Sequence, residues 1–130
     1  MLTGKSPVSH IHRLKSDELW SFNLGKPIIV IEITPKNVLK KIVLGNDPEQ
    51  LIKGNHNVSY LVKGGSWFGS YIQDGAEPND YSLVTCTVVP GFKFEEFELL
   101  NKGDEKSKGV KIPKKYQFMV YDNKKSKKKL

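Results

Sequence analysis

An all-β fold, a sandwich or barrel of short strands, is predicted by this sequence of 130 residues. From Ser9 to Val89, short apolar runs are separated every eight to twelve residues by turn-forming residues, which is typical of all-β proteins. No stretch of twelve residues repeats its apolar side chains with the 3.6-residue period of an amphipathic helix. The length fits one domain with a single core.

Eight apolar runs are the expected strands. In chain order they cover residues 8–13, 18–24, 27–33, 38–43, 49–53, 57–62, 67–72 and 81–89. The segments between them are rich in Gly and Asn, which tolerate a positive φ angle, and in Pro, which presets φ at the start of a turn. Residues 92–100 mix the two apolar periods and are consistent with either a strand or a short helix.

The first two runs carry polar side chains that strands would present to an apolar interior. His10 and His12 alternate, so an extended backbone would place both on one face. Glu18 alternates with Trp20 and Phe22 in the same way. The pattern predicts a polar site at the mouth of a barrel, without identifying the molecule that binds there.

The basic charge of the chain is concentrated in its last thirty residues. The formal net charge is +7, yet residues 1–100 carry ten Lys or Arg against eleven Asp or Glu, whereas residues 101–130 carry eleven Lys against three acidic residues. This composition predicts a largely flexible, Lys-rich tail, with residues 122–130 mobile. Residues 116–121 have strand character and could pair with a sheet edge. One hypothesis therefore treats residues 1–100 as a scaffold, and the tail as a weak, salt-dependent binder of nucleic acid or anionic lipid.

The cysteine and hydropathy patterns predict a cytoplasmic protein. The single cysteine, Cys86, has no internal disulfide partner and lies in a strand-like run. We therefore expect it to be a small buried side chain in a reducing compartment. The sequence has neither a signal-peptide pattern at its start nor an apolar run of 18 residues that could span a membrane.

Four segments resemble those of one protein family. They are His12–Trp20, Val43–Gly45, Val62–Trp67 and Cys86–Leu99, in this order along the chain. Over residues 1–100 they are similar to the Cupin_5 family of the cupin superfamily, which is related in fold to dTDP-4-keto-6-deoxyglucose 3,5-epimerases and germins. The resemblance implies a cupin-type double-stranded β-helix, or jelly-roll barrel, for residues 1–100, followed by the tail. It also implies a family segment upstream of Met1, so the chain is interpreted as N-terminally shortened.

The resemblance also implies a metal hypothesis. Metal-binding cupins use a His-x-His pair, a Glu a few residues further on and a His from a second motif, which makes His10, His12 and Glu18 the candidate ligands. Phe68 stands at the position of the second-motif His, and the spacing from His12 to Glu18 is one residue longer than usual. We therefore predict no bound metal and no other cofactor, with a metal-dependent cupin enzyme as the alternative.

The favoured hypothesis is a cupin-fold protein that binds a small polar molecule at the barrel mouth: a sugar, a nucleotide-sugar or a phosphate-bearing metabolite. The predicted ligand-binding residues are His12, Lys15, Glu18, Trp20 and Trp67. His12 titrates near neutral pH, Glu18 beside apolar rings is expected to have a raised pKa, and Lys15 would hold an anionic group. The tryptophans would stack on a sugar or base, with core packing as their alternative role, and Lys15 could instead lie in a solvated turn. Whether a reaction is catalysed is left open; by resemblance to the epimerases, His12 is the candidate general base.

The assembly is predicted from the same resemblance. Cupins of this kind commonly pair through strands near the N-terminus. A shortened barrel has an uncovered sheet edge there, and uncovered edges tend to pair with another chain. We therefore expect a homodimer joined by edge strands.

Overall fold

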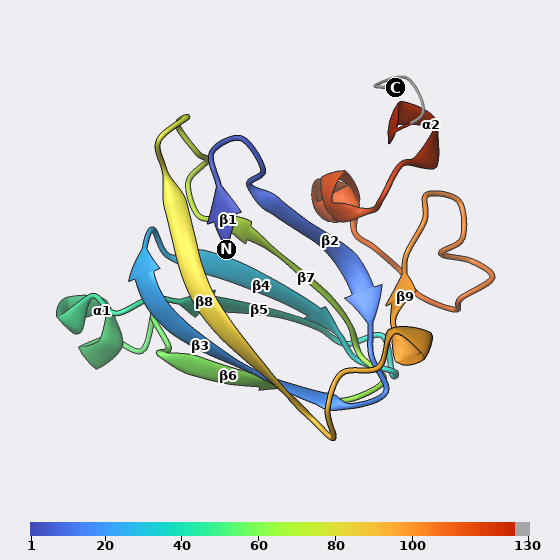
Figure 1. The fold of residues 1–130 in the computed structure, drawn as a ribbon, viewed down its shortest axis with the longest axis horizontal. Helices are drawn as coiled ribbons and strands as arrows, with labels where there is room; N and C mark the ends of the chain where they lie inside the picture. The colour runs from blue at the N-terminus through green and yellow to red at the C-terminus, as the bar shows by residue number, and fades with distance from the viewer. Residues whose placement is uncertain (127–130) are drawn as a thin grey trace.

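The computed structural model describes residues 1–126 and consists of two antiparallel β-sheets packed face to face (Figure 1). One sheet has four strands, in the spatial order β1 (Leu2–Thr3), β8 (Tyr81–Val89), β3 (Asp17–Gly25) and β6 (Ser59–Val62). The other has five, in the order β5 (Leu39–Leu44), β4 (Ile28–Ile33), β7 (Trp67–Ile72), β2 (Val8–Arg13) and β9 (Glu98–Leu99). This arrangement confirms the all-β prediction and is that of a jelly roll.

The helical elements are short. They are α1 (Pro48–Ile52), α2 (Asn123–Ser126) and the 3-10 helices η1 (Phe94–Glu96) and η2 (Lys114–Met119). None of the helices in residues 1–126 is both long enough and apolar enough to cross a membrane. Between residues 92 and 100 the chain forms both candidate structures, because η1 is followed directly by β9.

The prediction of a strand at residues 49–53 is wrong, because this segment forms α1. The Asp47 side chain accepts a hydrogen bond of 2.9 Å from the backbone N–H of Gln50 and so caps the helix. Pro48 occupies the first turn, where its missing N–H has no consequence, and Glu49 places a carboxylate at the positive end of the helix dipole. The other seven predicted runs all contain strands.

The centre of the five-stranded sheet is buried on both faces, as β4 shows, since all six residues of this strand are buried. Its inner face packs against the four-stranded sheet. That core contains Leu14, from the connection between β2 and β3, and residues of both sheets: Trp20, Ile28, Val30, Ile42, Leu44, Val62 and Phe68. Its outer face is covered by the C-terminal segment, which we define as residues 101–121 (Figure 1). That second core combines sheet residues with five from the segment: Val110, Ile112, Tyr116, Met119 and Val120.

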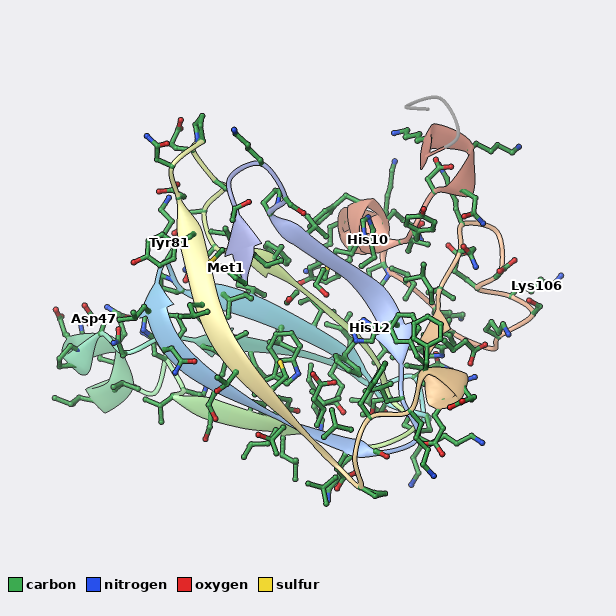
Figure 2. The ribbon with its side chains drawn as sticks, in the orientation of Figure 1. Met1, His10, His12, Asp47, Tyr81 and Lys106 are labelled. Atoms are coloured by element: carbon green, nitrogen blue, oxygen red, sulfur yellow. The ribbon has the colours of Figure 1, made fainter. Side chains whose placement is uncertain are left out.

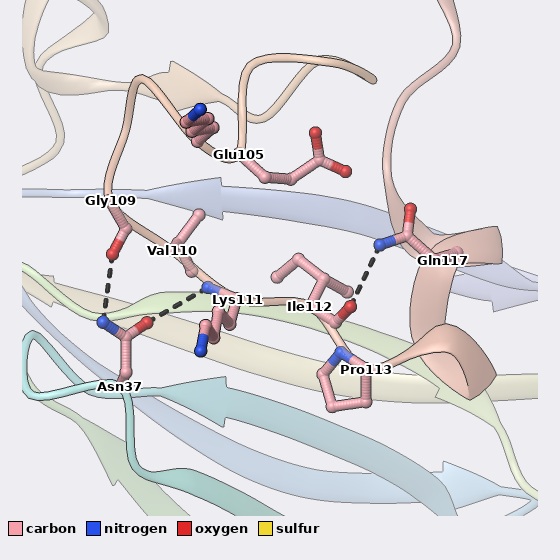
Figure 3. A pocket seen from close by; sticks show the side chains of 9 residues that line it. Asn37, Glu105, Gly109, Val110, Lys111, Ile112, Pro113 and Gln117 are labelled. Atoms are coloured by element: carbon pink, nitrogen blue, oxygen red, sulfur yellow. Dashed lines mark hydrogen bonds between the residues drawn. The ribbon is translucent and has the colours of Figure 1, made fainter.

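The C-terminal segment is attached to the sheet at two places. Asn37, in the turn between β4 and β5, donates a hydrogen bond of 3.0 Å from its side chain to the Gly109 carbonyl and accepts one of 3.1 Å from the N–H of Lys111 (Figure 3). The last residue of the segment returns to its start, because the N–H of Tyr121 donates to the carbonyl of Leu100, at 3.1 Å. The segment therefore spans the outer face of the sheet.

The prediction of a strand at residues 116–121 is wrong, because most of this stretch belongs to η2. Only Tyr121 pairs with a neighbouring segment, in an isolated bridge with Asn101. η2 lies on the face of the five-stranded sheet, which offers no hydrogen bonds out of its plane, and the tight turns of a 3-10 helix bond its backbone locally. Of residues 122–130, for which we expected mobility, 123–126 form α2, and 127–130 lie outside the described residues.

A bulge interrupts the pairing of β2 with β7. Ser9 is opposite Ser70 and His12 is opposite Phe68, so His10 and Ile11 together face the single residue Gly69. The extra residue changes the alternation of side chains along β2. Ser9 and His12 point into the sandwich, whereas His10 and Ile11 point to its outer face. Figure 2 shows His10 beside η2 and His12 near the end of β2.

Candidate functional site

A cavity of about 280 Å³ opens between the two sheets, and we call it the interior cavity. It is lined by Met1, Leu2, Ser9, His12, Glu18, Trp20, Ile28, Ser70, Val84 and Cys86. Its polar side chains come from strands β2, β3, β7 and β8, which the fold brings together although they are far apart in the sequence. It lies where the sequence predicts the site.

A larger cavity of about 830 Å³ lies along the C-terminal segment (Figure 3). The two side-chain amides that line it already have protein partners. Asn37 bonds to Gly109 and Lys111, and Gln117 donates to the carbonyl of Ile112 at 3.0 Å. These amides stabilise the segment itself, so the interior cavity is the better candidate for ligand binding.

His12 is held in one orientation inside the interior cavity. Its Nδ1 lies 2.8 Å from the carbonyl oxygen of His10. A carbonyl can only accept, so the proton of the neutral ring is on Nδ1, and Nε2 carries a lone pair. The ring centroid lies 4.3 Å from that of Phe68 and 5.3 Å from that of Phe97. Burial lowers the pKa of His12, although the bond to His10 acts in the opposite direction, so the ring is neutral at pH 7.

Glu18 lies in the same cavity and is 6% exposed. Burial raises its pKa, as the sequence predicted, and the neighbouring Cys86 thiol partly opposes this effect. Desolvation of the sulfur, together with the Glu18 carboxylate, raises the pKa of Cys86 to about 12. The thiol is therefore an unreactive hydrogen-bonding group at neutral pH.

The expectation that Cys86 is buried is wrong, because the residue is exposed. It lies in the part of β8 that pairs with β3 on one side and has no strand on the other among residues 1–126. Its side chain shares a face with Trp20, its direct cross-strand neighbour, and so lines the mouth of the interior cavity.

Two buried polar atoms in the interior cavity have no hydrogen-bond partner among residues 1–126. They are Nε1 of Trp20, a residue that is 4% exposed, and Oγ of Ser70, a residue that is fully buried. A buried polar group without a partner costs roughly 1–3 kcal/mol. Native proteins rarely leave such groups unsatisfied, so the pair makes the interior cavity a candidate site for a polar molecule.

The structure brings together three of the five predicted ligand-binding residues, His12, Glu18 and Trp20. Lys15 instead lines a separate cavity beside Glu95 and Glu96. Trp67 directly precedes Phe68 on β7 and therefore faces the outer core, where the Arg13 guanidinium lies 4.4 Å from the centroid of its ring. For Trp67, the alternative role of core packing is the one that the structure shows.

The metal ligand set that the resemblance implied is not assembled. The bulge in β2 turns His10 to the outer face, where its ring contacts Tyr121, while His12 lies inside. The expectation that both imidazoles share a face is therefore wrong. In the part of the chain that the structure describes, no three His, Cys, Asp or Glu side chains are grouped as they would be around a metal ion.

Sequence reasoning missed Ser9, Ser70 and the role of Cys86 in the cavity. Ser70 follows Phe68 by two residues and Cys86 lies between Val84 and Val88, so strand alternation places each of them on an apolar inner face. A small polar residue at an inward position was the available signal. The tertiary fold determines which strands face one another across the cavity, and no local pattern in the sequence indicates that.

A second buried carboxylate, Glu32, was also missed. Ser66 donates a hydrogen bond of 2.7 Å to one of its oxygens, and the hydroxyl of Tyr60 donates to the other. Burial and the contact with Glu32 raise the pKa of Tyr60 well above its ordinary value. Both carboxylate oxygens have partners, so this group stabilises the sandwich and is not an open binding site.

Two antiparallel sheets that enclose a cavity with polar side chains define a protein of the cupin class. The chain belongs to the family Cupin_5, described as "Cupin superfamily (DUF985)", whose model matches residues 1–100. The resemblance seen in the sequence is thus confirmed.

Relatives of the chain are found in bacteria and eukaryotes. The uncharacterised protein YML079W of Saccharomyces cerevisiae is 28% identical over 121 residues; the alignment covers 93% of this chain and 57% of the yeast protein. The chain thus spans little more than half of that relative. The crystal structure of protein SO0799 from Shewanella oneidensis is 31% identical, with a TM-score of 0.70, over 89% of this chain and 68% of that one. A hypothetical protein from Leishmania major is 29% identical, with a TM-score of 0.73, over 92% and 72%.

Proposed function

We propose that this protein binds a small polar organic molecule in the interior cavity, through His12, Glu18, Trp20 and Ser70. The observation that carries the proposal is the pair of unpartnered buried atoms, Trp20 Nε1 and Ser70 Oγ, in one cavity with the Nε2 lone pair of His12. Together they offer an N–H donor, a hydroxyl and an acceptor, and Glu18 adds a carboxyl group. Ligand sites commonly combine a few such polar groups with apolar walls.

The lining favours an uncharged, hydroxyl-bearing ligand such as a sugar. Among the residues that the structure describes, no Lys or Arg side chain lines the interior cavity, so none of them offers a basic side chain there for a phosphate. Sugar hydroxyls both donate and accept, which matches the mixed set of groups. The cavity volume of about 280 Å³ suits a ligand the size of a monosaccharide. A phosphate attached to such a ligand would lie outside the cavity.

A thermal-shift screen of monosaccharides and nucleosides tests the proposal. A ligand at a hundred times its dissociation constant stabilises the fold by about 2.7 kcal/mol, which is measurable as a rise in melting temperature. We expect His12→Ala, Glu18→Gln and Ser70→Ala to lose the stabilisation. Lys15→Ala is the control and should keep it, because Lys15 lines a different cavity. The proposal is contradicted if no compound stabilises the protein, or if the three cavity variants respond as the unmodified protein does.

An isomerase or epimerase is the second candidate function. The observation that favours it is the opposite perturbation of two groups in one cavity: the pKa of His12 is lowered and that of Glu18 is raised. A neutral imidazole can accept a proton through Nε2, and a carboxyl group with a raised pKa can donate one. Incubation of a stabilising sugar with the protein in D₂O tests for this activity, since proton abstraction from carbon would replace a C–H signal in the NMR spectrum. Retention of every C–H signal would leave binding as the function.

We further propose a homodimer joined through β8. Within residues 1–126, positions 83–89 of this strand pair with β3 on one side only, because β1 reaches no further than Ser82 on the other. The unpaired N–H and C=O groups along this edge can bond to the same strand of a second copy.

A further inference from the structure

The bulge in β2 lies between the interior cavity and the C-terminal segment. Its two residues, His10 and Ile11, are opposite the single residue Gly69. Bulged residues lack part of the regular ladder of hydrogen bonds, so their conformation depends on what packs around them. At this bulge, the packing partners on the outer face come from the C-terminal segment.

Met119 of η2 packs directly on the bulge. A Cβ atom added to Gly69 would lie 2.8 Å from the Ser9 carbonyl oxygen, 3.0 Å from Cε of Met119 and 3.1 Å from the N atom of Ile11. The missing side chain of Gly69 therefore leaves the space that the Met119 methyl group and the bulged backbone share. Met119 and Ile11 are both fully buried.

Tyr121 contacts the other bulged residue. Its ring meets the ring of His10 edge to face, with the centroids 5.4 Å apart. Its backbone N–H donates to Leu100, whose own N–H donates to the carbonyl of Ile11 at 2.9 Å. The C-terminal segment thus contacts the bulge through one side chain on each bulged residue and through a chain of backbone hydrogen bonds.

On the inner side, the bulge supplies the group that orients His12. The carbonyl of His10 accepts the Nδ1 proton of His12. In a neutral histidine, the tautomer is set by the hydrogen bond that one ring nitrogen makes. The direction of the His10 carbonyl therefore decides whether Nε2 offers a lone pair or a proton to the cavity.

We propose that Met119 and Tyr121 are positioning residues for the interior cavity: by packing on the outer side of the β2 bulge, they fix the His10 carbonyl and with it the tautomer of His12. The link to ligand affinity rests on the proposed function. The tautomer itself does not, because it can be measured without a ligand.

NMR of the protein labelled with ¹⁵N in histidine tests the proposal. At pH 8, long-range ¹H–¹⁵N correlations show which nitrogen of each ring is protonated. We expect the His12 proton on Nδ1 in the unmodified protein and a mixture containing the Nε2–H form in Met119→Ala. The same variant should bind a cavity ligand more weakly, by roughly two- to thirtyfold. Met119→Leu, which restores the buried volume, should restore the Nδ1–H form.

Phe118→Ala is the matched control. Phe118 is the neighbour of Met119 in η2, but it is half exposed and its ring packs edge to face on Tyr71. It should leave the His12 signals unchanged. Tyr121→Leu is the milder test variant, because it removes the ring contact with His10 while keeping an apolar side chain. The proposal is overturned if the His12 proton is on Nε2 in the unmodified protein, or if folded Met119→Ala and Tyr121→Leu both keep the Nδ1–H form. Either result leaves the binding proposal standing, since loss of thermal stabilisation is measured separately.

Discussion

Glu18 is a carboxyl group that the fold places at the mouth of an apolar sandwich. Burial favours its protonated form, and the pKa is raised for that reason. Between the ordinary pKa of a glutamate and the raised value, the folded protein holds a proton that the unfolded chain has already released. Stability therefore falls as the pH rises through this window, by about 1.4 kcal/mol for each unit of the shift.

Glu18→Gln removes this pH dependence, because an amide does not titrate. We expect the stability of the variant, measured as its free energy of unfolding, to increase relative to that of the unmodified protein as the pH rises from 4 to 7. Urea unfolding followed by tryptophan fluorescence at several pH values measures the difference. Glu95→Gln, at an exposed position, is the control for replacing a carboxylate by an amide. If the difference in unfolding free energy between Glu18→Gln and the unmodified protein does not change with pH, the pKa of Glu18 is not raised in the folded protein.

The residues of the cavity show how far the sequence could define the site. Alternation predicted that Glu18 and Trp20 face inward, and this was correct because β3 is regular over these positions. The same reasoning failed for His10. The extra residue of the bulge in β2 shifts the alternation by one, so the side chains before it lie on the opposite face from the one that alternation predicts. The bulge packs against Gly69 and Met119, which are distant from β2 in the sequence, so no local sequence pattern indicates it.

Among the elements, the turn between β6 and β7 is tightly fitted to its surroundings. A Cβ atom on Gly64 would lie 2.0 Å from the carbonyl oxygen of Lys15. The N–H of Gly64 also donates to the Asp17 side chain at 2.8 Å, and that of Gly65 donates to the carbonyl of Leu14, also at 2.8 Å. The turn thus packs against the connection from β2 to β3, the two strands that carry His12 and Glu18.

Gly64→Ala should destabilise the protein by about 3 kcal/mol, because the clash is with backbone, which cannot rotate away. The corresponding fall in melting temperature, measured by circular dichroism, is roughly 10 °C for a domain of this size. Gly91→Ala is the matched control, since an added Cβ there meets nothing within 4 Å. Its effect should stay within about 0.5 kcal/mol. Equal melting temperatures for the two variants would contradict the close fit at Gly64.

Helix α1 and η2 mark the limit of sequence reasoning for elements. The signal for α1 was present, since Asp47 followed by Pro48 and Glu49 is typical of a helix start, but the apolar run that followed was interpreted as a strand. For η2 there was no comparable signal. Residues 116–121 have strand propensity, and only their position on the face of a sheet determines a 3-10 helix.

At the scale of the whole molecule, the C-terminal segment gives the five-stranded sheet its second core. Its lysines dominate the composition and predicted a flexible tail, while its apolar residues are spread thinly between them. Val110, Ile112 and Met119 are nevertheless buried on Ile29, Ile31 and Ile33 of β4. The continuous apolar run of β4 was the clue, because a strand that is apolar on both faces needs a cover on both.

The four-stranded sheet is open at its β8 edge. Beyond Ser82, β8 has no neighbour on the side of β1 among residues 1–126 (Figure 1). The exposed residues Thr85 and Thr87 are uncharged, so no charge along the middle of this edge opposes pairing with a second copy. Around a two-fold axis near Cys86, antiparallel pairing would extend the sheet across both copies.

We therefore predict a homodimer, with a mass by light scattering of twice 14.7 kDa at micromolar concentration. Thr85→Lys should weaken it, because the two-fold axis brings the new ammonium groups of both copies together, and like charges across paired strands repel. We expect the dimer dissociation constant to rise roughly three- to tenfold. Ser59→Lys is the matched control: Ser59 and Thr85 are both exposed, and both are cross-strand neighbours of Ser21, but Ser59 lies on β6 at the other edge of the sheet. A monomeric mass for the unmodified protein would reject the dimer, whereas equal weakening by both lysines would place its interface away from β8.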